Sequence, residues 1–446
     1  MPPAMERRDF LLGFSATGAV ASTQVAAAAD ADALAARGVK IAPTMADLRA
    51  LKPTLGSSDQ VRGDPRAGDL AWLRGHHRPN DGGEGFFHWD AESKDTDNGG
   101  TVIALNGGRG RWVRAYSGPI NVQWFETAAK ALEYANVLYD AVLFFPRSPT
   151  AYKCGDKIVK SGVTIQGEGI SSKISGKLTF ATGPRSITGA CRDVVLENGA
   201  HLQGCRNRLF ENVQFGDIVT FDEKALSHYN TFLNCVWIGV GSAIRVPNNN
   251  HFNKVISCRI ALNHGFSEGI KIAHADGWNI IGTSIEALPD AMEPFGPFLD
   301  LDGRNHTVSG CWLERRYNLG TYEPGVILRG EGINFQIGSL VHYAPLDDRG
   351  QNNVISGALW HASYKKMYLV ENSGVTPVMP NKNGEGSIPH GLYKPPQTAV
   401  VCMKGRTANN VDLIATDREN IIVRIKDPKG ADVTTGSYEI SWHSKT

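Results

Sequence analysis

The 446-residue sequence lacks several features that mark common classes of protein. Lysine and arginine number 46 and aspartate and glutamate number 45, so no overall field favours nucleic acid as a partner. There is no phosphate-binding loop, dinucleotide fingerprint or Gly-x-Ser-x-Gly motif. The sequence therefore gives no support for nucleotide binding, for a serine hydrolase or for a nucleic acid partner.

The cysteines lack the spacing of a metal site. None lies in a Cys-x-x-Cys motif or a His/Cys pattern typical of zinc, and an odd number cannot be fully paired within one chain. Several occupy repeated places inside apolar strands, where a free cysteine packs as a small hydrophobe. We therefore expect mostly buried, reduced thiols and no metal centre. The seven residues are Cys154, Cys191, Cys205, Cys235, Cys258, Cys311 and Cys402.

Long amphipathic helices are also scarce, whereas glycine is abundant, at 49 residues. Valine, isoleucine, threonine and aromatic residues dominate the apolar runs. This balance predicts an all-β protein with many turns.

Residues 1–29 have the layout of an export signal, with a basic start, a mild apolar run and an alanine-rich end. The run is too short and too rich in glycine and alanine to span a membrane, so no membrane insertion is expected. The adjacent Arg7 and Arg8 resemble a twin-arginine signal, which exports folded proteins. The sequence predicts a mature chain that begins near Asp30 and is periplasmic or secreted.

A repeated segment of varying period follows. Each copy begins with a polar residue, usually asparagine, and most then alternate apolar residues with small or polar ones. A second apolar run, such as AIRV or GIKI, follows most copies. The copies are NRLFENVQF from 207, NTFLNCVWI from 230, NKVISCRIA from 253, NIIGTSIEA from 279, HTVSGCWLE from 306, NFQIGSLVH from 334 and NVISGALWH from 353.

This pattern predicts a parallel β-helix, in which each coil contributes short parallel strands and inward residues stack between coils. The repeated asparagine suits a turn where its side chain bonds to the backbone. A β-sandwich also has short alternating strands, but the Asn-Gly hairpin signals that it needs are rare between residues 160 and 375.

Both ends of such a helix need covers, and these define the expected domains. Helical spacing over residues 124–139 places Trp124, Ala128, Leu132, Ala135 and Leu138 on one face. We expect an N-terminal capping region at 30–120, the β-helix at 121–385 and a C-terminal antiparallel β module at 386–446.

Residues 68–125 resemble the N-terminal region of pectate-lyase-like β-helix proteins, a group that includes bacteriophage tailspike depolymerases. The resemblance implies a right-handed parallel β-helix, frequent trimerisation and action on polysaccharides, but it transfers no catalytic residue. The residues that carry it are Gly82, Gly83, Gly85, Trp89, Asp90, Asn98, Gly99, Gly100 and Trp112, with the turn glycines Gly107, Gly108 and Gly110.

Alternation within the repeats predicts a column of outward side chains. Cys311 and Leu313 are expected to point inward, which turns Trp312 and Glu314 outward. A strict repeat alignment would bury Glu286, and an unpaired buried carboxylate costs several kcal/mol, so a one-residue slip that buries Thr283 and Ile285 is favoured.

The predicted column is therefore Glu286, Glu314 and His342, and His361 would continue it on the next coil. Neighbouring strands lie about 4.8 Å apart, close to the carboxylate separation of retaining glycosidases. Flanking residues suited to sugar rings and acidic groups are Arg315, Arg316, Tyr317, Trp312 and Tyr343. A merely solvated face with surface ion pairs explains the same residues equally well.

Three functions remain open. The leading hypothesis is an exported enzyme that hydrolyses an acidic polysaccharide, with Glu314 and Glu286 as acid and as nucleophile or base. The second is a polysaccharide lyase in which His342 or Tyr343 abstracts a proton and Arg315 or Arg316 neutralises a sugar carboxylate. The third is a non-catalytic glycan-binding or scaffold protein, whose expected signature is exposed aromatic side chains.

No cofactor is expected, although two segments allow a cation. Residues 95–100, DTDNGG, hint at a calcium loop, but Gly99 falls where a further oxygen ligand should lie, so a turn is favoured. Asp300 and Asp302 in GPFLDLDGRN could bind a cation or line a cleft, or simply make a turn.

Overall fold

The computed structural model divides into two compact units, one formed by the chain up to Ser117 together with Gln123–Glu126, and the other by Gly118–Val122 and Thr127–Thr446. Residues 1–30, which include the predicted export signal, lie outside the part that the structure describes. The described residues are 31–53, 69–107, 109–138, 140–183, 189–263, 268–288, 296–314, 325–337, 341–342, 346–361, 366–369, 371–392, 395–404, 409–417 and 419–445.

The N-terminal unit is a small sheet with the strand order β1-β2-β3-β5-β4. Trp89 and Trp112 pack edge to face in its core, with ring centroids 5.3 Å apart. Gly100 is required close by, because a Cβ there would lie 2.6 Å from the Phe125 ring. The elements are α1 (Ala31–Ala36), β1 (Lys40–Ala42), α2 (Met45–Ala50), β2 (Leu70–Leu73), β3 (Gly85–Asp90), β4 (Val102–Ala104) and β5 (Arg111–Arg114).

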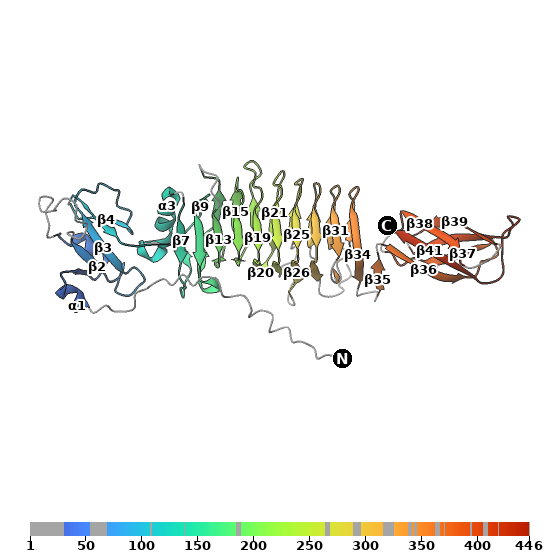
Figure 1. The fold of residues 1–446 in the computed structure, drawn as a ribbon, viewed down its shortest axis with the longest axis horizontal. Coiled ribbons are helices and arrows are strands. Elements are labelled where there is room, and N and C mark those ends of the chain that lie inside the picture. Colours follow the sequence, from blue (N-terminus) through green and yellow to red (C-terminus); the bar gives the residue numbers. More distant parts are fainter. Residues whose placement is uncertain are drawn as a thin grey trace, which may run out of the picture. The chain divides into compact units, whose positions relative to one another are not determined.

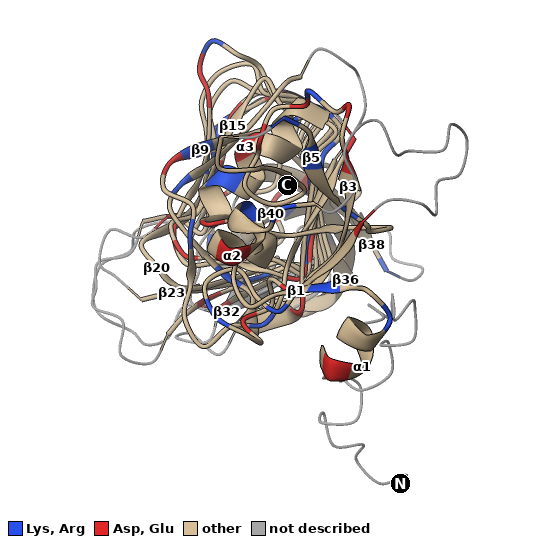
Figure 2. Ribbon diagram, turned by 90° about the vertical axis from the view of Figure 1, so that its left-hand side faces the viewer, with Lys and Arg blue, Asp and Glu red and all other residues tan. Residues whose placement is uncertain are grey.

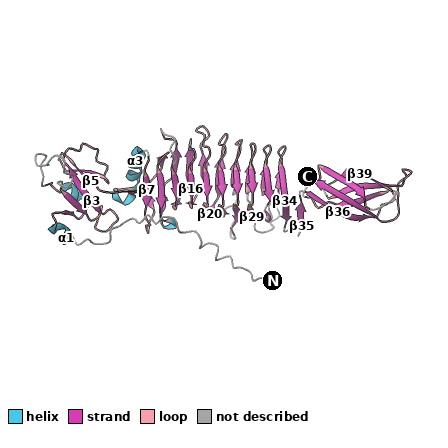
Figure 3. Ribbon diagram, in the orientation of Figure 1, coloured by secondary structure: helices cyan, strands magenta, loops and turns pink. Residues whose placement is uncertain are grey.

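The second unit contains the parallel β-solenoid that the repeats predicted (Figure 1). Within the described residues, nine complete coils each contribute one strand to each of three sheets, and Figure 3 shows how strongly strands dominate. Sheet 1 comprises β6 (Ile120–Asn121), β7 (Val142–Phe145), β10 (Thr164–Gly167), β13 (Ala190–Arg192), β16 (Leu209–Glu211), β19 (Thr231–Leu233), β22 (Lys254–Ile256), β25 (Asn279–Ile281), β28 (Thr307–Ser309), β31 (Asn334–Ile337), β34 (Val354–His361) and β35 (Lys366–Leu369).

Sheets 2 and 3 continue each coil. Sheet 2 comprises β8 (Tyr152–Lys153), β11 (Lys173–Ser175), β14 (Val195–Leu196), β17 (Gln214–Phe215), β20 (Val236–Val240), β23 (Arg259–Leu262), β26 (Ser284–Ala287), β29 (Trp312–Glu314) and β32 (Val341–His342). Sheet 3 comprises β9 (Lys157–Lys160), β12 (Leu178–Ala181), β15 (Ala200–Gln203), β18 (Val219–Phe221), β21 (Ser242–Val246), β24 (Glu268–Ile272), β27 (Leu299–Leu301), β30 (Val326–Leu328) and β33 (Leu346–Asp348).

The first six predicted repeats each form a strand of sheet 1 followed by a strand of sheet 2, and the second apolar run forms sheet 3, whereas the seventh repeat, from 353, forms only β34 of sheet 1. Cys235, Cys258 and Cys311 are buried at equivalent places between the first two strands, as expected of small inward residues. All seven cysteines are unpaired, and Cys402 alone among them is exposed. The prediction of mostly buried thiols is therefore confirmed.

Buried asparagines hold the turns between sheets 3 and 1. The Asn253 Oδ1 accepts hydrogen bonds from the backbone N–H and the Nδ2 of Asn230, each at 2.9 Å. The Asn230 Oδ1 in turn accepts from the backbone N–H of Arg208 at 3.0 Å. These bonds confirm the predicted role of asparagine, since each side chain satisfies backbone groups of the preceding coil.

Helix α3 (Ala128–Leu138) packs against the first coil, where the Asn136 Nδ2 donates to the Ile158 carbonyl at 2.7 Å. It buries Ala128, Leu132 and Ala135 as predicted, together with Ala131. Two assignments were wrong: Trp124 belongs to the preceding 3-10 turn η2 (Val122–Trp124), and the Leu138 side chain is 40% exposed. The helix is shorter than expected because Thr127, before its first residue, accepts from the Lys130 N–H as a cap.

The C-terminal module consists of two three-stranded antiparallel sheets. One contains β36 (Glu371–Val378), β41 (Tyr438–Lys445) and β38 (Thr398–Met403), and the other β37 (Glu385–Pro389), β40 (Asn420–Lys426) and β39 (Asn410–Thr416). Because β36 pairs with β41 along its whole length, the module begins earlier than the predicted boundary at residue 386. A further 3-10 turn, η3 (Gly169–Ser171), lies between β10 and β11.

Figure 2 shows both basic and acidic residues on the described part of the chain. Among the described residues, no helix is long and apolar enough to cross a membrane.

Candidate functional site

The predicted column of outward residues follows the strand register of sheet 2. Glu286 on β26 pairs with Glu314 on β29, and Glu314 pairs with His342 on β32. Thr283 and Ile285 are fully buried, so the one-residue slip that the cost of a buried carboxylate required has taken place.

The two glutamates have different partners. The Glu286 Oε1 lies 2.7 Å from the Nε and 2.6 Å from a terminal nitrogen of Arg259, which is on the preceding strand β23. The Glu314 Oε2 accepts a hydrogen bond from the indole Nε1 of Trp312 at 3.0 Å. One glutamate therefore faces a cation, whereas the other is bonded by a neutral donor.

A second outward row runs beside the column. Arg259, Ser284 and Trp312 are in register on three successive strands, two residues before the column positions. Sequence reasoning missed Arg259, because aligning NKVISCRIA with NIIGTSIEA residue by residue places it opposite the buried Ile285, whereas the register of β23 with β26 places it beside Ser284. The outer face of sheet 2 thus combines two carboxylates, one guanidinium and one indole.

Of the other predicted site residues, only Trp312 and His361 lie within the described part of the chain. Arg315, Arg316, Tyr317 and Tyr343 lie outside the described residues. His361 does not continue the column, because it ends β34 in sheet 1 and pairs with Lys366 of the antiparallel strand β35. The chain reverses direction there, so the coil that would have carried the next column position does not form.

The DTDNGG segment is a turn in the N-terminal unit. The Asn98 Oδ1 accepts from the backbone N–H groups of Gly100, Thr101 and Val102, at 2.8 to 3.0 Å. Asp97 is bonded by Arg49 and by backbone N–H groups, so its oxygens serve the turn. Within the described residues no group of three His, Cys, Asp or Glu side chains has the arrangement of a metal site.

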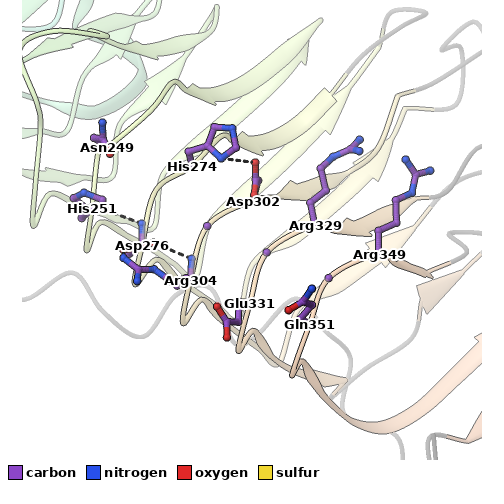
Figure 4. Close-up of a pocket in the computed structure, with 13 residues that line it drawn as sticks. Asn249, His251, His274, Asp276, Asp302, Arg304, Arg329, Glu331, Arg349 and Gln351 are labelled. Atoms are coloured by element: carbon purple, nitrogen blue, oxygen red, sulfur yellow. Dashed lines mark hydrogen bonds and ion pairs between the residues drawn. The ribbon is translucent and has the colours of Figure 1, made fainter. Parts of the chain in front are cut away.

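A pocket of about 570 Å³ lies on the turns that connect sheet 3 to sheet 1, a size typical of small-molecule sites. We call it the turn pocket. Figure 4 shows its side chains projecting from successive turns. Its lining residues are Asn249, His251, His274, Asp276, Asp302, Gly303, Arg304, Arg329, Gly330, Glu331, Arg349, Gly350 and Gln351.

Ion pairs between neighbouring coils organise the turn pocket. The Asp276 carboxylate accepts from the backbone N–H and a guanidinium nitrogen of Arg304, both at 2.9 Å. The Asp302 carboxylate lies 2.9 Å from the His274 Nδ1, and the buried Asp300 binds the Arg329 Nε at 2.7 Å. Asp302 thus lines a cleft, one of the roles that the sequence left open, while Asp300 is committed to Arg329.

Three glycines form one wall of the turn pocket. A Cβ at Gly303, Gly330 or Gly350 would lie 1.8 to 2.0 Å from a carbonyl oxygen of the preceding coil. Only glycine permits this approach, and the resulting column without side chains leaves room for the pocket. The recurring turns LDGRN, LRGEG and DRGQN were the sequence signal for this site, which the search for charged strand residues missed.

Within the N-terminal unit, the strand order and the packed tryptophans describe a small β domain. Residues 41–117 match the family model of a phage tail protein small four-stranded beta-sheet domain. The match covers this unit and does not reach the solenoid. No curated protein matches the chain.

Similar solved structures are mostly phage tailspikes. Tailspike gp49 of Acinetobacter baumannii bacteriophage Fri1, a capsular polysaccharide depolymerase, is 10% identical, with 91% of this chain and 98% of that chain covered and a TM-score of 0.44. The tailspike of Acinetobacter phage vB_ApiP_P1 is 13% identical, with the same coverage and TM-score. Pantoea stewartii WceF, a glycan biofilm modifying enzyme, is 10% identical over 91% of this chain and 70% of that chain, with a TM-score of 0.36. Identities this low transfer no residue roles.

Proposed function

We propose that this protein cleaves the glycosidic bonds of a polysaccharide on the outer face of sheet 2. The observation that carries the proposal is the direct pairing of Glu286 with Glu314 on adjacent strands, with both side chains partly exposed. Adjacent strands are about 4.8 Å apart, near the ~5–5.5 Å between the carboxyl groups of retaining glycosidases.

The partners of the two glutamates suggest their roles. Glu286, in its ion pair with Arg259, suits the charged group that attacks the anomeric carbon. Glu314, bonded by the neutral Trp312 indole, suits the acid that gives its proton to the departing glycosidic oxygen. Glu314 would then remove a proton from the water that hydrolyses the glycosyl ester on Glu286, which regenerates both groups.

The remaining predicted residues have supporting roles in this proposal. Arg315, Arg316 and Tyr317 follow Glu314 directly in the chain and would contact the substrate, the arginines binding acidic sugars. The resemblance of the N-terminal region to tailspike depolymerases supports a polysaccharide substrate. The signal-like residues 1–29 would deliver the enzyme to the periplasm or the medium.

Elimination is the second candidate, favoured by the register of His342 with Glu314. In this reaction His342 or Tyr343 would take the proton next to a uronate carboxylate, and the leaving sugar would depart as the double bond forms. Because only elimination leaves an unsaturated uronate, ultraviolet absorbance of the products distinguishes the two reactions.

The test compares Glu314→Gln and Glu286→Gln on a panel of acidic polysaccharides. Each variant should lose roughly 10²–10⁴ in rate, the usual contribution of a positioned acid or base. The matched control is Glu268→Gln on sheet 3, since Glu268 is also a strand glutamate in an ion pair with an arginine, Arg245. If both column variants keep the activity of the control, the column is a solvated face and the proposal is wrong.

A further inference from the structure

Two exposed aromatic side chains stack on neighbouring turns beside the turn pocket. The rings of Tyr229 and Phe252 are 5.4 Å apart between centroids and nearly parallel, at 7°. Tyr229 is 54% exposed and Phe252 44% exposed. We call them the aromatic pair. Exposed aromatic side chains are the signature expected of a glycan-binding surface.

The aromatic pair occupies an unusual backbone position. At one position in each of seven successive turns the residue has a positive φ, between 53° and 68°, and on six of them its N–H bonds to a carbonyl of the next coil. The residues are Asn207, Tyr229, Phe252, Gly277, Asn305, Gly332 and Asn352. Glycine and asparagine tolerate this conformation, whereas bulky residues rarely adopt it.

The fold therefore does not require aromatic residues there. Five of the seven turns use glycine or asparagine with the same backbone conformation, and the aromatic residues of the other two remain about half exposed. Strained positions that the fold does not explain occur preferentially at binding sites. This mismatch is independent of the exposure of the rings, and both features favour a binding role for the aromatic pair.

The aromatic pair and the turn pocket are continuous. Phe252 follows His251, and its ring covers Gly277, where a Cβ would lie 2.4 Å from the ring. His228 and His251 form a parallel stack beside the pair, with centroids 5.5 Å apart. Gly277 itself follows Asp276, whose carboxylate holds Arg304. An apolar platform thus borders a row of charged hydrogen-bonding groups.

Each guanidinium that lines the turn pocket is paired with a carboxylate. Its lining contains three carboxylates, from Asp276, Asp302 and Glu331, and three guanidiniums, and Arg304 is paired with Asp276 within the lining. The other two guanidiniums, of Arg329 and Arg349, bind Asp300 and Asp347. An anionic ligand would have to displace one of these carboxylates to reach a guanidinium, whereas neutral hydroxyl groups can bond to both partners of a pair.

We infer that the aromatic pair and the turn pocket bind a neutral pyranose unit of a polysaccharide, on turns that do not include the Glu286–Glu314 face. The C–H face of the sugar would pack on the rings, and its hydroxyl groups would bond to the Asp276–Arg304 pair. The inference rests on the proposed function only in taking a polysaccharide as the ligand. This site holds the polymer and has no part in bond cleavage.

The test is affinity electrophoresis of the full chain in gels containing dextran, galactomannan or glucomannan, with alginate and polygalacturonate as acidic counterparts. Tyr229→Asn with Phe252→Asn is the informative variant, because asparagine already occupies this position in three other turns. Loss of both rings should weaken retardation by neutral polymers about tenfold, which corresponds to about 1.4 kcal/mol of binding free energy. The matched control, Ile281→Thr, removes an exposed apolar side chain from sheet 1.

The outcomes are decisive in each direction. Retardation by a neutral polymer that the double variant loses, and that Ile281→Thr and Glu314→Gln retain, supports the site even if no polymer is cleaved. No retardation by any neutral polymer, or retardation that the double variant keeps, overturns it. A change in molecular mass of the double variant in light scattering would show instead that the pair joins copies of this chain.

Discussion

The buried asparagines beneath the aromatic pair allow a quantitative prediction. Asn253 directly follows Phe252, and its side chain is fully buried. Its Oδ1 accepts two hydrogen bonds from Asn230, and its Nδ2 lies 3.2 Å from the carbonyl oxygens of Ser227, Asn250 and His251. Asn253→Ala would remove all of these contacts while leaving the turn backbone intact.

The expected cost is local and large. The backbone N–H of Asn230, which is fully buried, would lose its acceptor, which costs about 1–3 kcal/mol, and the three longer contacts to carbonyls add a smaller amount. A total of about 3 kcal/mol corresponds to an opening equilibrium about a hundredfold larger. Because solenoids unfold in segments, one global unfolding midpoint would understate this effect.

Native-state hydrogen exchange measures the change directly. Peptides spanning Asn230 should exchange about a hundredfold faster in Asn253→Ala, with little change in the N-terminal unit. The control is Asn248→Ala, which removes an exposed side chain from the same turn. If the two variants exchange alike around Asn230, the asparagine bonds do not hold these turns together and the reasoning fails.

Three further predictions concern acid stability, export and assembly. Burial opposes ionisation of Asp97, but bonds from Arg49, Ala104 and Gly99 outweigh it and lower its pKa below 3.8. The stability that ionised Asp97 contributes is therefore complete above about pH 4 and is lost as the pH falls further. Asp97→Asn should accordingly flatten the decline in Tm between pH 5 and 2. Replacing Arg7 and Arg8 by lysine should abolish export in cell fractionation, and a mature form outside the cytoplasm would exclude a twin-arginine signal. Light scattering should give the mass of a homotrimer, whereas a monomer at all accessible concentrations would reject it.

The strands and the column could be predicted because both follow from local patterns. Alternation within CWLE predicted which side chains point outward. The energetic cost of burying Glu286 then required a one-residue shift in the alignment of its repeat. The end of the column could not be predicted in this way. The 19-residue spacing from 334 to 353 suggests another coil, but β34 instead forms a short antiparallel hairpin with β35, and the sequence between these strands contains no Asn-Gly or Asp-Gly turn signal.

The turn pocket could not be predicted from the sequence, because the loops that form it differ in length. Four residues separate Ile272 from the left-handed Gly277, but only three separate Leu301 from Asn305, so counting along the chain does not align Asp276 with Arg304. The glycine in each of these turns is evident in the sequence, but the space that it leaves beside the charged side chains is not. Only the stacking of one coil on the next shows that these glycines leave a hollow between charged side chains.

The aromatic pair was present in the sequence as a departure from the repeat. His228-Tyr229-Asn230 and His251-Phe252-Asn253 recur 23 residues apart, just where other turns place asparagine or glycine before the strand. All seven turns have the same backbone conformation at this position, but only two of them place an aromatic residue there. An aromatic residue is therefore not needed to form the coils. At the five turns with glycine or asparagine, the conformational preference of the residue matches the backbone that the fold imposes. At Tyr229 and Phe252 it does not, and such conflicts are expected at binding sites. The same reasoning directs attention in other solenoids to the turns that break their own repeat.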